Sequence, residues 1–310
     1  QESIPYEWVT GKLGVSAQTV KSLERAGAVR IVSTQALRNP VSLSAAREQK
    51  KRLSDAPRRI VEEVMGDFES GRPHTYLLHG ITGSGKTEVY MQLVSEMVER
   101  GRQAIVLIPE IALTYQTLLR FYTRFGDRVS ILNSNLSPGE KYDQCERARN
   151  GEIDVIIGPR SALFTPFPHI GLIIMDEEHE GSYKSEASPK YHARETAIQV
   201  ARLHGASVLL GSATPSLESY YRAGTGEYRL FTLKERLTGG ELPKVHTIDL
   251  RRELKEGNRS IFSRKLQELL ADRISKKEQS ILFLNRRGYA GFVSCRACGH
   301  VMKCPHCDVS

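Results

Sequence analysis

The sequence predicts an α/β protein whose main domain is a doubly wound parallel sheet. Short runs rich in Ile, Val and Leu follow one another from Thr75 onward, namely "YLLH", "AIVLI", "RVSIL", "DVIIG", "LIIM" and "SVLLG". Uniformly apolar runs of this length are typical of strands that are buried on both faces of a parallel sheet. Helical patterns lie between the runs and supply the layers that would cover both faces. The two observations together predict helices on either side of one sheet.

The composition is that of a globular protein with a basic surface. The length of 310 residues indicates two or three folded domains. The contents of 40% hydrophobic and 26% charged residues argue against extended disorder. Lys and Arg (44) outnumber Asp and Glu (36), giving a formal net charge of +8. This excess favours polyanionic partners, although a solvated basic surface has the same composition. The sequence has neither a membrane-spanning apolar run nor a signal pattern, so we expect a cytoplasmic protein without membrane contact.

Residues 1–50 are predicted to form a winged-helix domain with its linker. The segment Val9–Ile31 has the pattern of two helices joined by a turn. The apolar side of this pair would comprise Leu13, Val15, Val20 and Leu23. Ser16 is a suitable N-cap for the second helix and Gly27 a suitable stop, and "AVRIVS" is predicted to follow as a β-ribbon. Some winged helices contact DNA and others are docking or spacer modules, so both alternatives stay open.

A domain boundary is predicted near residues 45–57. The stretch "SAAREQKKRLSDAPRR" is strongly charged, and Pro57 near its end would break a helix. We therefore predict that the sheet domain occupies residues 51–238.

The segment "HGITGSGKTEVY" has the spacing of a Walker A phosphate-binding loop. It lies between the run "YLLH" and a helical pattern with Val89, Leu93 and Met97 on its apolar stripe and Gly101 as its stop. In such loops the glycines let backbone N–H groups face a phosphate, the lysine reaches the β- and γ-phosphates and the hydroxyl ligates Mg²⁺. The predicted ATP–Mg²⁺ site comprises Gly80, Ile81, Thr82, Gly83, Ser84, Gly85, Lys86 and Thr87. The alternative is a glycine-rich turn that only joins a strand to a helix.

An acidic segment follows the apolar run in "LIIMDEEHE". A nucleotide-bound metal needs a carboxylate at such a strand end, and hydrolysis needs a group that orients water. We predict that Asp176 holds Mg²⁺ and that Glu177 positions or deprotonates the attacking water. Together with Lys86 they form the predicted catalytic set. A solvated acidic loop is the alternative.

The segment "SYKSEASPKYHARE" combines aromatic and cationic residues with little apolar content. Stacking faces interleaved with cations suit unpaired bases, with each stack contributing about 1–3 kcal/mol. We predict that Tyr183, Lys184, Tyr191 and Arg194 contact DNA. The alternative is a surface loop whose two tyrosines pack locally.

Seven motifs in a fixed order resemble those of the superfamily 2 DNA helicases, and among them the helicases that restart stalled replication forks. They are "GITGSGKT", "IPEIALT", "IIGPRSALFTPF", "DEEHE", "YHARE", "GSATPS" and "LFLNRRGY", followed by paired cysteines. The resemblance runs from the N-terminal helices to the last residue. It implies a RecA-like P-loop NTPase lobe at residues 51–238, the start of a second RecA-like lobe at 239–293 and a zinc-binding insertion beginning at 294–310.

The resemblance also implies roles for residues in the strand-end loops. Thr114, Arg160 and Ser161 would contact the phosphates of single-stranded DNA, because the matching segments line the DNA path in such helicases. Ser212 and Thr214 of "GSATPS" would couple the nucleotide state to the grip on DNA. The alternatives are a surface salt bridge for Arg160 and a helix N-cap for "GSATPS".

The C-terminal part is predicted to begin a second lobe and a zinc site. "VHTIDLRRE" and "QSILFLNRRGYAG" flank the helical pattern "SRKLQELLADRI". Two C-x-x-C pairs follow, formed by Cys295, Cys298, Cys304 and Cys307, and such pairs present thiolates to zinc, with redox pairs as the alternative. In the family, eight cysteines hold two zinc ions. This chain carries the first two pairs, so its sites are expected to be incomplete.

Three further departures from the family pattern are visible. The DNA-binding domain that precedes the winged helix is missing, Pro57 stands where a glutamine would recognise adenine, and the later second-lobe motifs with the arginine finger are absent. The chain is therefore expected to be an internal piece of a longer helicase.

The function implied by the resemblance is that of an ATP-dependent 3′ to 5′ DNA helicase or translocase. It would recognise stalled or branched replication forks and initiate restart by primosome assembly. Its partners would be single-stranded and branched DNA, primosome proteins and single-stranded DNA-binding protein. A fork-binding scaffold with ATP as a conformational switch is the rival hypothesis, and DNA-independent ATP turnover would favour it.

Overall fold

The computed structural model describes residue 4 and residues 6–32, 37–39, 53–236, 243–283 and 300. The chain divides into two compact units, Gln1–Gly240 and Glu241–Ser310. The first unit contains the sheet, and the second contains two of the described helices.

The first unit is built on a seven-stranded sheet in which every neighbouring pair is parallel. The strands are β1 (Thr75–Gly80), β2 (Gln103–Leu107), β3 (Val129–Ile131), β4 (Val155–Gly158), β5 (Ile170–Asp176), β6 (Ser207–Ser212) and β7 (Arg229–Leu233), in the order β3-β4-β2-β5-β6-β1-β7. The first six coincide with the six predicted runs, so the parallel sheet is confirmed. The sequence did not indicate β7, because this edge strand is only partly buried and has no continuous apolar run.

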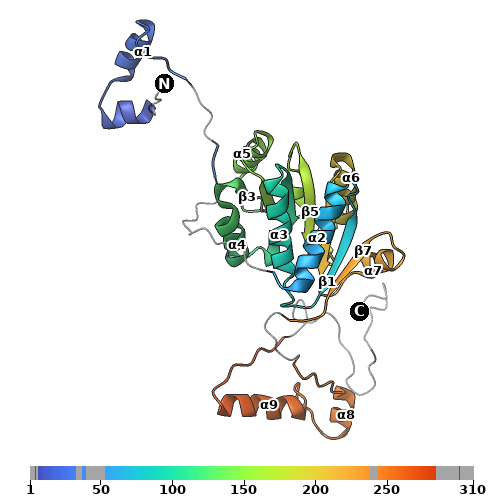
Figure 1. Cartoon of the computed structure of the whole chain (residues 1–310). Helices are drawn as coiled ribbons and strands as arrows, with labels where there is room; N and C mark the ends of the chain where they lie inside the picture. Colours follow the sequence, from blue (N-terminus) through green and yellow to red (C-terminus); the bar gives the residue numbers. More distant parts are fainter. Residues whose placement is uncertain are drawn as a thin grey trace, which may run out of the picture. The chain divides into compact units, whose positions relative to one another are not determined.

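Helices cover both faces of the sheet (Figure 1). On one face, α2 (Asp55–Glu69), α3 (Lys86–Glu99) and α4 (Tyr115–Phe125) pack on a core cluster that includes Leu78 of β1. On the other face, α6 (Ala193–His204) packs on a second cluster that includes Leu77. Adjacent residues of one strand therefore enter opposite cores, as strand geometry requires. The doubly wound arrangement is confirmed.

Further helices and turns belong to the sheet region of this unit. They are α5 (Pro138–Arg149), α7 (Leu217–Gly224) and the 3-10 turns Glu110–Ala112, Gly126–Arg128, Arg160–Phe164 and Gly181–Tyr183. The predicted apolar stripe of α3 is confirmed, because Val89, Leu93 and Met97 are fully buried.

The role predicted for Pro57 as a helix breaker is wrong. Pro57 lies in the first turn of α2, which begins two residues earlier, at Asp55. The first four N–H groups of a helix have no partner within the helix, so a proline there removes no hydrogen bond. Pro57 is also buried and contributes to packing.

Among the described N-terminal residues, the predicted pair of helical segments is present and the predicted ribbon is not. A five-residue π-helix (Trp8–Lys12) precedes α1 (Ala17–Arg25), Ser16 caps α1 through the backbone N–H of Thr19, and Gly27 ends it with a positive φ. Residues 28–32 of the predicted ribbon are described and do not form a strand. The Ile31 N–H donates to the Glu24 carboxylate at 3.0 Å, where a ribbon would need a strand partner.

The apolar side predicted for these helices does not form a core. Val20 is buried, whereas Leu13 and Leu23 are exposed.

The second unit contains α8 (Leu250–Lys255) and α9 (Arg264–Ser275) among its described residues. The helix predicted from "SRKLQELLADRI" is confirmed, and Ser263 caps it by accepting from the Leu266 N–H at 3.1 Å.

The predicted zinc ligands lie outside the described residues; they are Cys295, Cys298, Cys304 and Cys307. Among the residues that are described, no group of three or more His, Cys, Asp or Glu side chains is arranged to hold a metal ion. None of the described helices combines the length and the apolar composition that crossing a bilayer requires.

Candidate active site at the carboxyl edge of the sheet

Three predicted motifs meet where neighbouring strands end. The loop of residues 80–87, called the phosphate loop below, begins at the end of β1. The acidic segment begins at the end of β5, and "GSATPS" begins at the end of β6, which pairs with both β1 and β5. The loops after β2 and β4 lie along the same edge, because all these strands are parallel. These loops therefore share one edge of the sheet, and this edge is where α/β folds bind ligands.

The phosphate loop has a backbone that only glycine adopts easily. Gly83 and Gly85 have φ values of 82° and 96°, in the left-handed region, and Gly85 is the N-cap of α3. Gly80 leaves room for a neighbouring side chain, since a Cβ there would lie 2.6 Å from Ser84 Oγ. The loop is thus shaped by side chains packed against its backbone at the start and by left-handed glycines at its end.

The polar groups of this loop fit a phosphate ligand. Ser84 Oγ is buried and, in the described part of the chain, has no hydrogen-bond partner. Lys86 Nζ donates a hydrogen bond of 2.7 Å to the carbonyl oxygen of Gly80, on the other side of the same loop. Thr87 follows it in the first turn of α3, whose N-terminus carries partial positive charge. The loop thus offers a buried hydroxyl, a lysine cation and a helix N-terminus. Together they provide the hydrogen-bond donors and positive charge that a nucleoside triphosphate needs.

The acidic segment begins with a carboxylate that the fold holds in place. Tyr90 of α3 donates from its hydroxyl to Asp176 Oδ1 at 3.0 Å. Glu177 follows with φ 47°, in the left-handed region that a residue with a side chain rarely adopts. Backbone strain of this kind is found preferentially at functional sites.

Both carboxyl groups are easier to protonate than usual. Burial raises the pKa of Asp176, and the Tyr90 hydrogen bond and the Lys86 charge oppose this. Burial, followed by repulsion from Asp176, raises the pKa of Glu177. A carboxylate with a raised pKa is a stronger base, and an added cation at the site would favour the ionised form of both.

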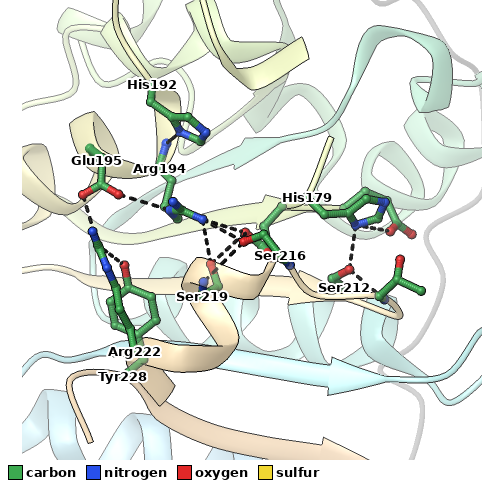
Figure 2. A network of polar contacts seen from close by, with 12 residues as sticks. His179, His192, Arg194, Glu195, Ser212, Ser216, Ser219, Arg222 and Tyr228 are labelled. Atoms are coloured by element: carbon green, nitrogen blue, oxygen red, sulfur yellow. Dashed lines mark hydrogen bonds and ion pairs between the residues drawn. The ribbon is translucent and has the colours of Figure 1, made fainter. Parts of the chain in front are cut away.

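The next residue of the segment, Glu178, is the centre of a buried polar network. Its side chain is completely buried. It accepts from the Ser216 N–H at 2.7 Å, from the Ser219 hydroxyl at 2.8 Å and from Arg194 at 3.3 Å. Arg194 also donates to the hydroxyls of Ser216 and Ser219, as Figure 2 shows. The network joins the acidic segment to the starts of α6 and α7.

A second link joins the acidic segment to "GSATPS". His179 Nδ1 lies 2.7 Å from Ser212 Oγ, and Ser212 Oγ accepts from the Thr214 N–H at 3.0 Å (Figure 2). The N-cap that was weighed as the alternative for "GSATPS" is also present, since Ser216 caps α7. The coupling role of Ser212 and Thr214 remains a prediction.

Two predicted DNA contacts are wrong because the side chains are buried. Tyr183 is 1% exposed, and its hydroxyl donates to the carbonyl oxygens of Asp176 at 2.6 Å and Leu107 at 3.0 Å. Its ring offers no face to a base. Arg194 is 7% exposed and its guanidinium is occupied by the network around Glu178. Both residues hold the loop in place from inside.

The other predicted DNA contacts lie at the surface. Lys184 and Ser161 are exposed, and Thr114 is exposed and caps α4. Arg160 donates to the backbone carbonyls of Ser182 and Lys184 at 2.7 and 2.8 Å and so connects two of the predicted DNA segments. Whether these residues contact DNA remains a prediction.

An aromatic pair in this region was missed in part. Tyr191 packs edge to face on Phe164, with ring centroids 5.3 Å apart, and Phe164 is 56% exposed. The sequence signal was present, because "RSALFTPF" places an aromatic residue three positions after Ser161. Tyr90 and Glu178 were also missed. Tyr90 lies in an apolar helical pattern and so resembles a core residue, and Glu178 is the third acid of a run and so resembles a solvent-exposed residue.

Comparison with known proteins decides the family. Residues 58–223, more than half of the chain, match the family model described as DEAD/DEAH box helicase. The chain belongs to this family. Six of the seven helicase motifs identified in the sequence lie within the matched residues, and "LFLNRRGY" lies beyond them.

Two curated relatives of this chain carry the same name. Replication restart protein PriA of Bacillus subtilis (strain 168) is 46% identical over 99% of this chain, and that of Synechocystis sp. is 45% identical over 95%. The chain spans 38% and 36% of the lengths of these two proteins. The predicted resemblance to replication-restart helicases is confirmed. The chain is also similar to a solved structure of RecG bound to a three-way DNA junction, at 25% identity and a TM-score of 0.45. The match covers 67% of this chain and 28% of the RecG chain.

Proposed function

We propose that this chain provides the ATP-hydrolysing lobe of a 3′ to 5′ DNA helicase that recognises stalled or branched forks and initiates replication restart. The observation that carries the proposal is the meeting of the phosphate loop with the Asp176–Glu177 pair across β1, β6 and β5. The name of the curated relatives supports the replication-restart context.

The proposed hydrolysis assigns one task to each residue of the site. The phosphate loop binds the β- and γ-phosphates of ATP, and Lys86 neutralises their charge. Thr87 and Asp176 would hold Mg²⁺, which would supply charge neutralisation on the phosphate oxygens. Glu177 orients a water molecule for attack on the γ-phosphorus and accepts its proton as the bond to the bridging oxygen breaks. The raised pKa of Glu177 suits this role as a base.

The proposed DNA path runs along the neighbouring strand-end loops. Thr114, Arg160, Ser161 and Lys184 would contact phosphates, and Tyr191 with Phe164 would offer an aromatic surface to a base. Support comes from the exposure of Phe164 and from the bridge that Arg160 makes to the loop of Lys184.

Further parts of the proposal rest on the resemblance. Cys295, Cys298, Cys304 and Cys307 would contribute to two zinc sites of the full-length protein. Elemental analysis of that protein should find two zinc ions per chain, and one or none would contradict this assignment. Primosome proteins and single-stranded DNA-binding protein are the proposed partners, in the cytoplasm.

The decisive experiment compares ATP hydrolysis and strand separation in the full-length protein. Single-stranded DNA should stimulate phosphate release, and unwinding should require a 3′ rather than a 5′ single-stranded tail on the fork. Glu177→Gln should bind ATP and DNA but release little phosphate. Phosphate release that is indifferent to DNA, with fork binding retained, would favour the scaffold with an ATP switch.

A further inference from the structure

Tyr90 is a buried hydroxyl at the site that the proposed mechanism does not use. It lies on α3, is 2% exposed and donates to Asp176 Oδ1 at 3.0 Å. A buried tyrosine hydroxyl needs a hydrogen-bond partner. Burying a charged carboxylate as that partner costs free energy, the more so next to a phosphate site. The pairing therefore calls for an explanation beyond packing.

The neighbouring strand is shaped around this hydroxyl. Gly211 of β6 is the direct cross-strand partner of Asp176 of β5. A Cβ at Gly211 would lie 1.6 Å from Tyr90 Oη and 2.7 Å from Cζ of the same ring. No side chain fits there, so the sheet itself leaves room for the hydroxyl beside the carboxylate.

The helix that carries Tyr90 also carries the other residue proposed to hold Mg²⁺. Thr87 and Tyr90 are three positions apart on α3 and so lie on the same side of the helix. Thr87 would bind the metal directly, while Tyr90 fixes the rotation of the Asp176 carboxylate at the end of β5. One rigid helix thus sets the spacing between both metal-holding groups.

We propose that Tyr90 is a positioning residue that orients Asp176 for Mg²⁺, with Gly211 as the residue that admits its hydroxyl. The inference rests on the proposed function of the site. Hydrogen-bond partners of metal-holding carboxylates typically change metal affinity by about 10- to 100-fold when they are removed.

The test measures metal-dependent nucleotide binding without turnover. The affinity of the 310-residue chain for the non-hydrolysable analogue AMP-PNP is determined by calorimetry in excess Mg²⁺ and in EDTA, and the ratio is the Mg²⁺ gain. Tyr90→Phe should lower this gain by about 10-fold or more while leaving the affinity in EDTA within about twofold of wild type. The affinity in EDTA also reports that the site is folded.

Tyr76→Phe is the matched control. Tyr76 is likewise buried and donates to a carboxylate, Asp67 Oδ2, at 2.9 Å, but it lies at the start of β1 and so at the opposite end of the strand from the site. Its loss should leave the Mg²⁺ gain unchanged. An equal gain in Tyr90→Phe, Tyr76→Phe and wild type would overturn the inference.

Two further variants keep the inference testable. Asp176→Asn should abolish most of the Mg²⁺ gain, and adding Tyr90→Phe should then lower it no further, because Tyr90 acts only through Asp176. An additional loss in the double variant would place the effect elsewhere. If Tyr90→Phe fails to fold, Gly211→Ala displaces the same hydroxyl, and a normal Mg²⁺ gain in that variant would contradict the proposal. Wild-type protein that binds no AMP-PNP at all would refute the proposed function instead.

Discussion

The phosphate loop and the acidic segment lie on strands separated only by β6, yet their polar groups are satisfied in opposite ways. In the phosphate loop, Ser84 has a buried hydroxyl without a partner in the described part, and Lys86 is bound to the carbonyl of its own loop. In the acidic segment, Tyr90 holds Asp176, and four donor groups surround Glu178. The loop therefore keeps polar groups free for the proposed nucleotide, whereas the polar groups of the acidic segment already have protein partners.

This contrast has a physical reason. A group that binds a ligand must exchange one set of partners for another, so strong internal partners would compete with the ligand. A group that positions a water or a metal must instead be rigid before the ligand arrives. Substitutions in the loop should therefore impair function with little change in stability. Substitutions behind the acidic segment should impair function and also lower stability.

The largest effect is expected for Lys86→Ala. Removing the cation should lower ATP hydrolysis by about 10²- to 10³-fold, as the loss of one transition-state donor does. The melting temperature should hardly change, because among the described residues the Lys86 side chain has only the hydrogen bond to Gly80 to lose, within a partly exposed loop. Phosphate release and differential scanning fluorimetry are the measurements. A large drop in melting temperature would break the distinction between the two regions.

The largest effect on stability is expected for Arg194→Met. This change leaves the buried Glu178 carboxylate without its cation, which should cost about 3–5 kcal/mol. Arg222→Met is the matched control from the same network, since Arg222 is 29% exposed at its side chain and pairs with a half-exposed Glu195. It should cost about 1 kcal/mol or less. Urea unfolding measures both, and equal losses would show that Glu178 does not depend on Arg194.

A smaller loss is expected for Gly211→Ala. The new Cβ would collide with the Tyr90 ring, and overpacking of this kind costs about 1–3 kcal/mol. Gly181→Ala is the control, because nothing lies within 4 Å of a Cβ there and the backbone is not left-handed. Thermal unfolding of the two variants should differ accordingly. If both are as stable as wild type, the close approach of Tyr90 to β6 is not a feature of the protein in solution.

The same contrast explains what the sequence revealed. The phosphate loop and the strands around it could be predicted because each depends on local chemistry, such as glycine at positive φ or a continuous apolar run. The edge strand β7 lacked such a run. Tyr183 and Arg194 were misjudged because their partners, the carbonyl of Leu107 and the side chains of Ser216 and Ser219, are distant in sequence. Aromatic and cationic residues in a loop have the same composition whether they point outward or anchor the loop from within.

The smallest effect concerns pH and the start of α6. His192 is the N-cap of α6, and its Nδ1 accepts from the Arg194 N–H at 3.2 Å, which requires the neutral ring. Burial lowers the pKa of His192, and the charge of Arg194 lowers it further. A base whose pKa is lower in the folded than in the unfolded state binds fewer protons when folded. The stability it contributes is therefore present above the unfolded value of about 6.5 and is lost as the pH falls from there through the lower pKa of the folded state.

His192→Asn should remove this dependence, because asparagine accepts the same hydrogen bond and does not titrate. The drop in melting temperature between pH 7.5 and pH 5.5 should become smaller by about 1–3 °C, as expected for a contribution below about 1 kcal/mol in a domain of this size. His246→Asn, which changes an exposed histidine of the second unit, should leave the drop as it is in wild type. An unchanged drop in His192→Asn would mean that the start of α6 tolerates a charged ring. The protein-held side of the site would then be less rigid than the contrast with the phosphate loop requires.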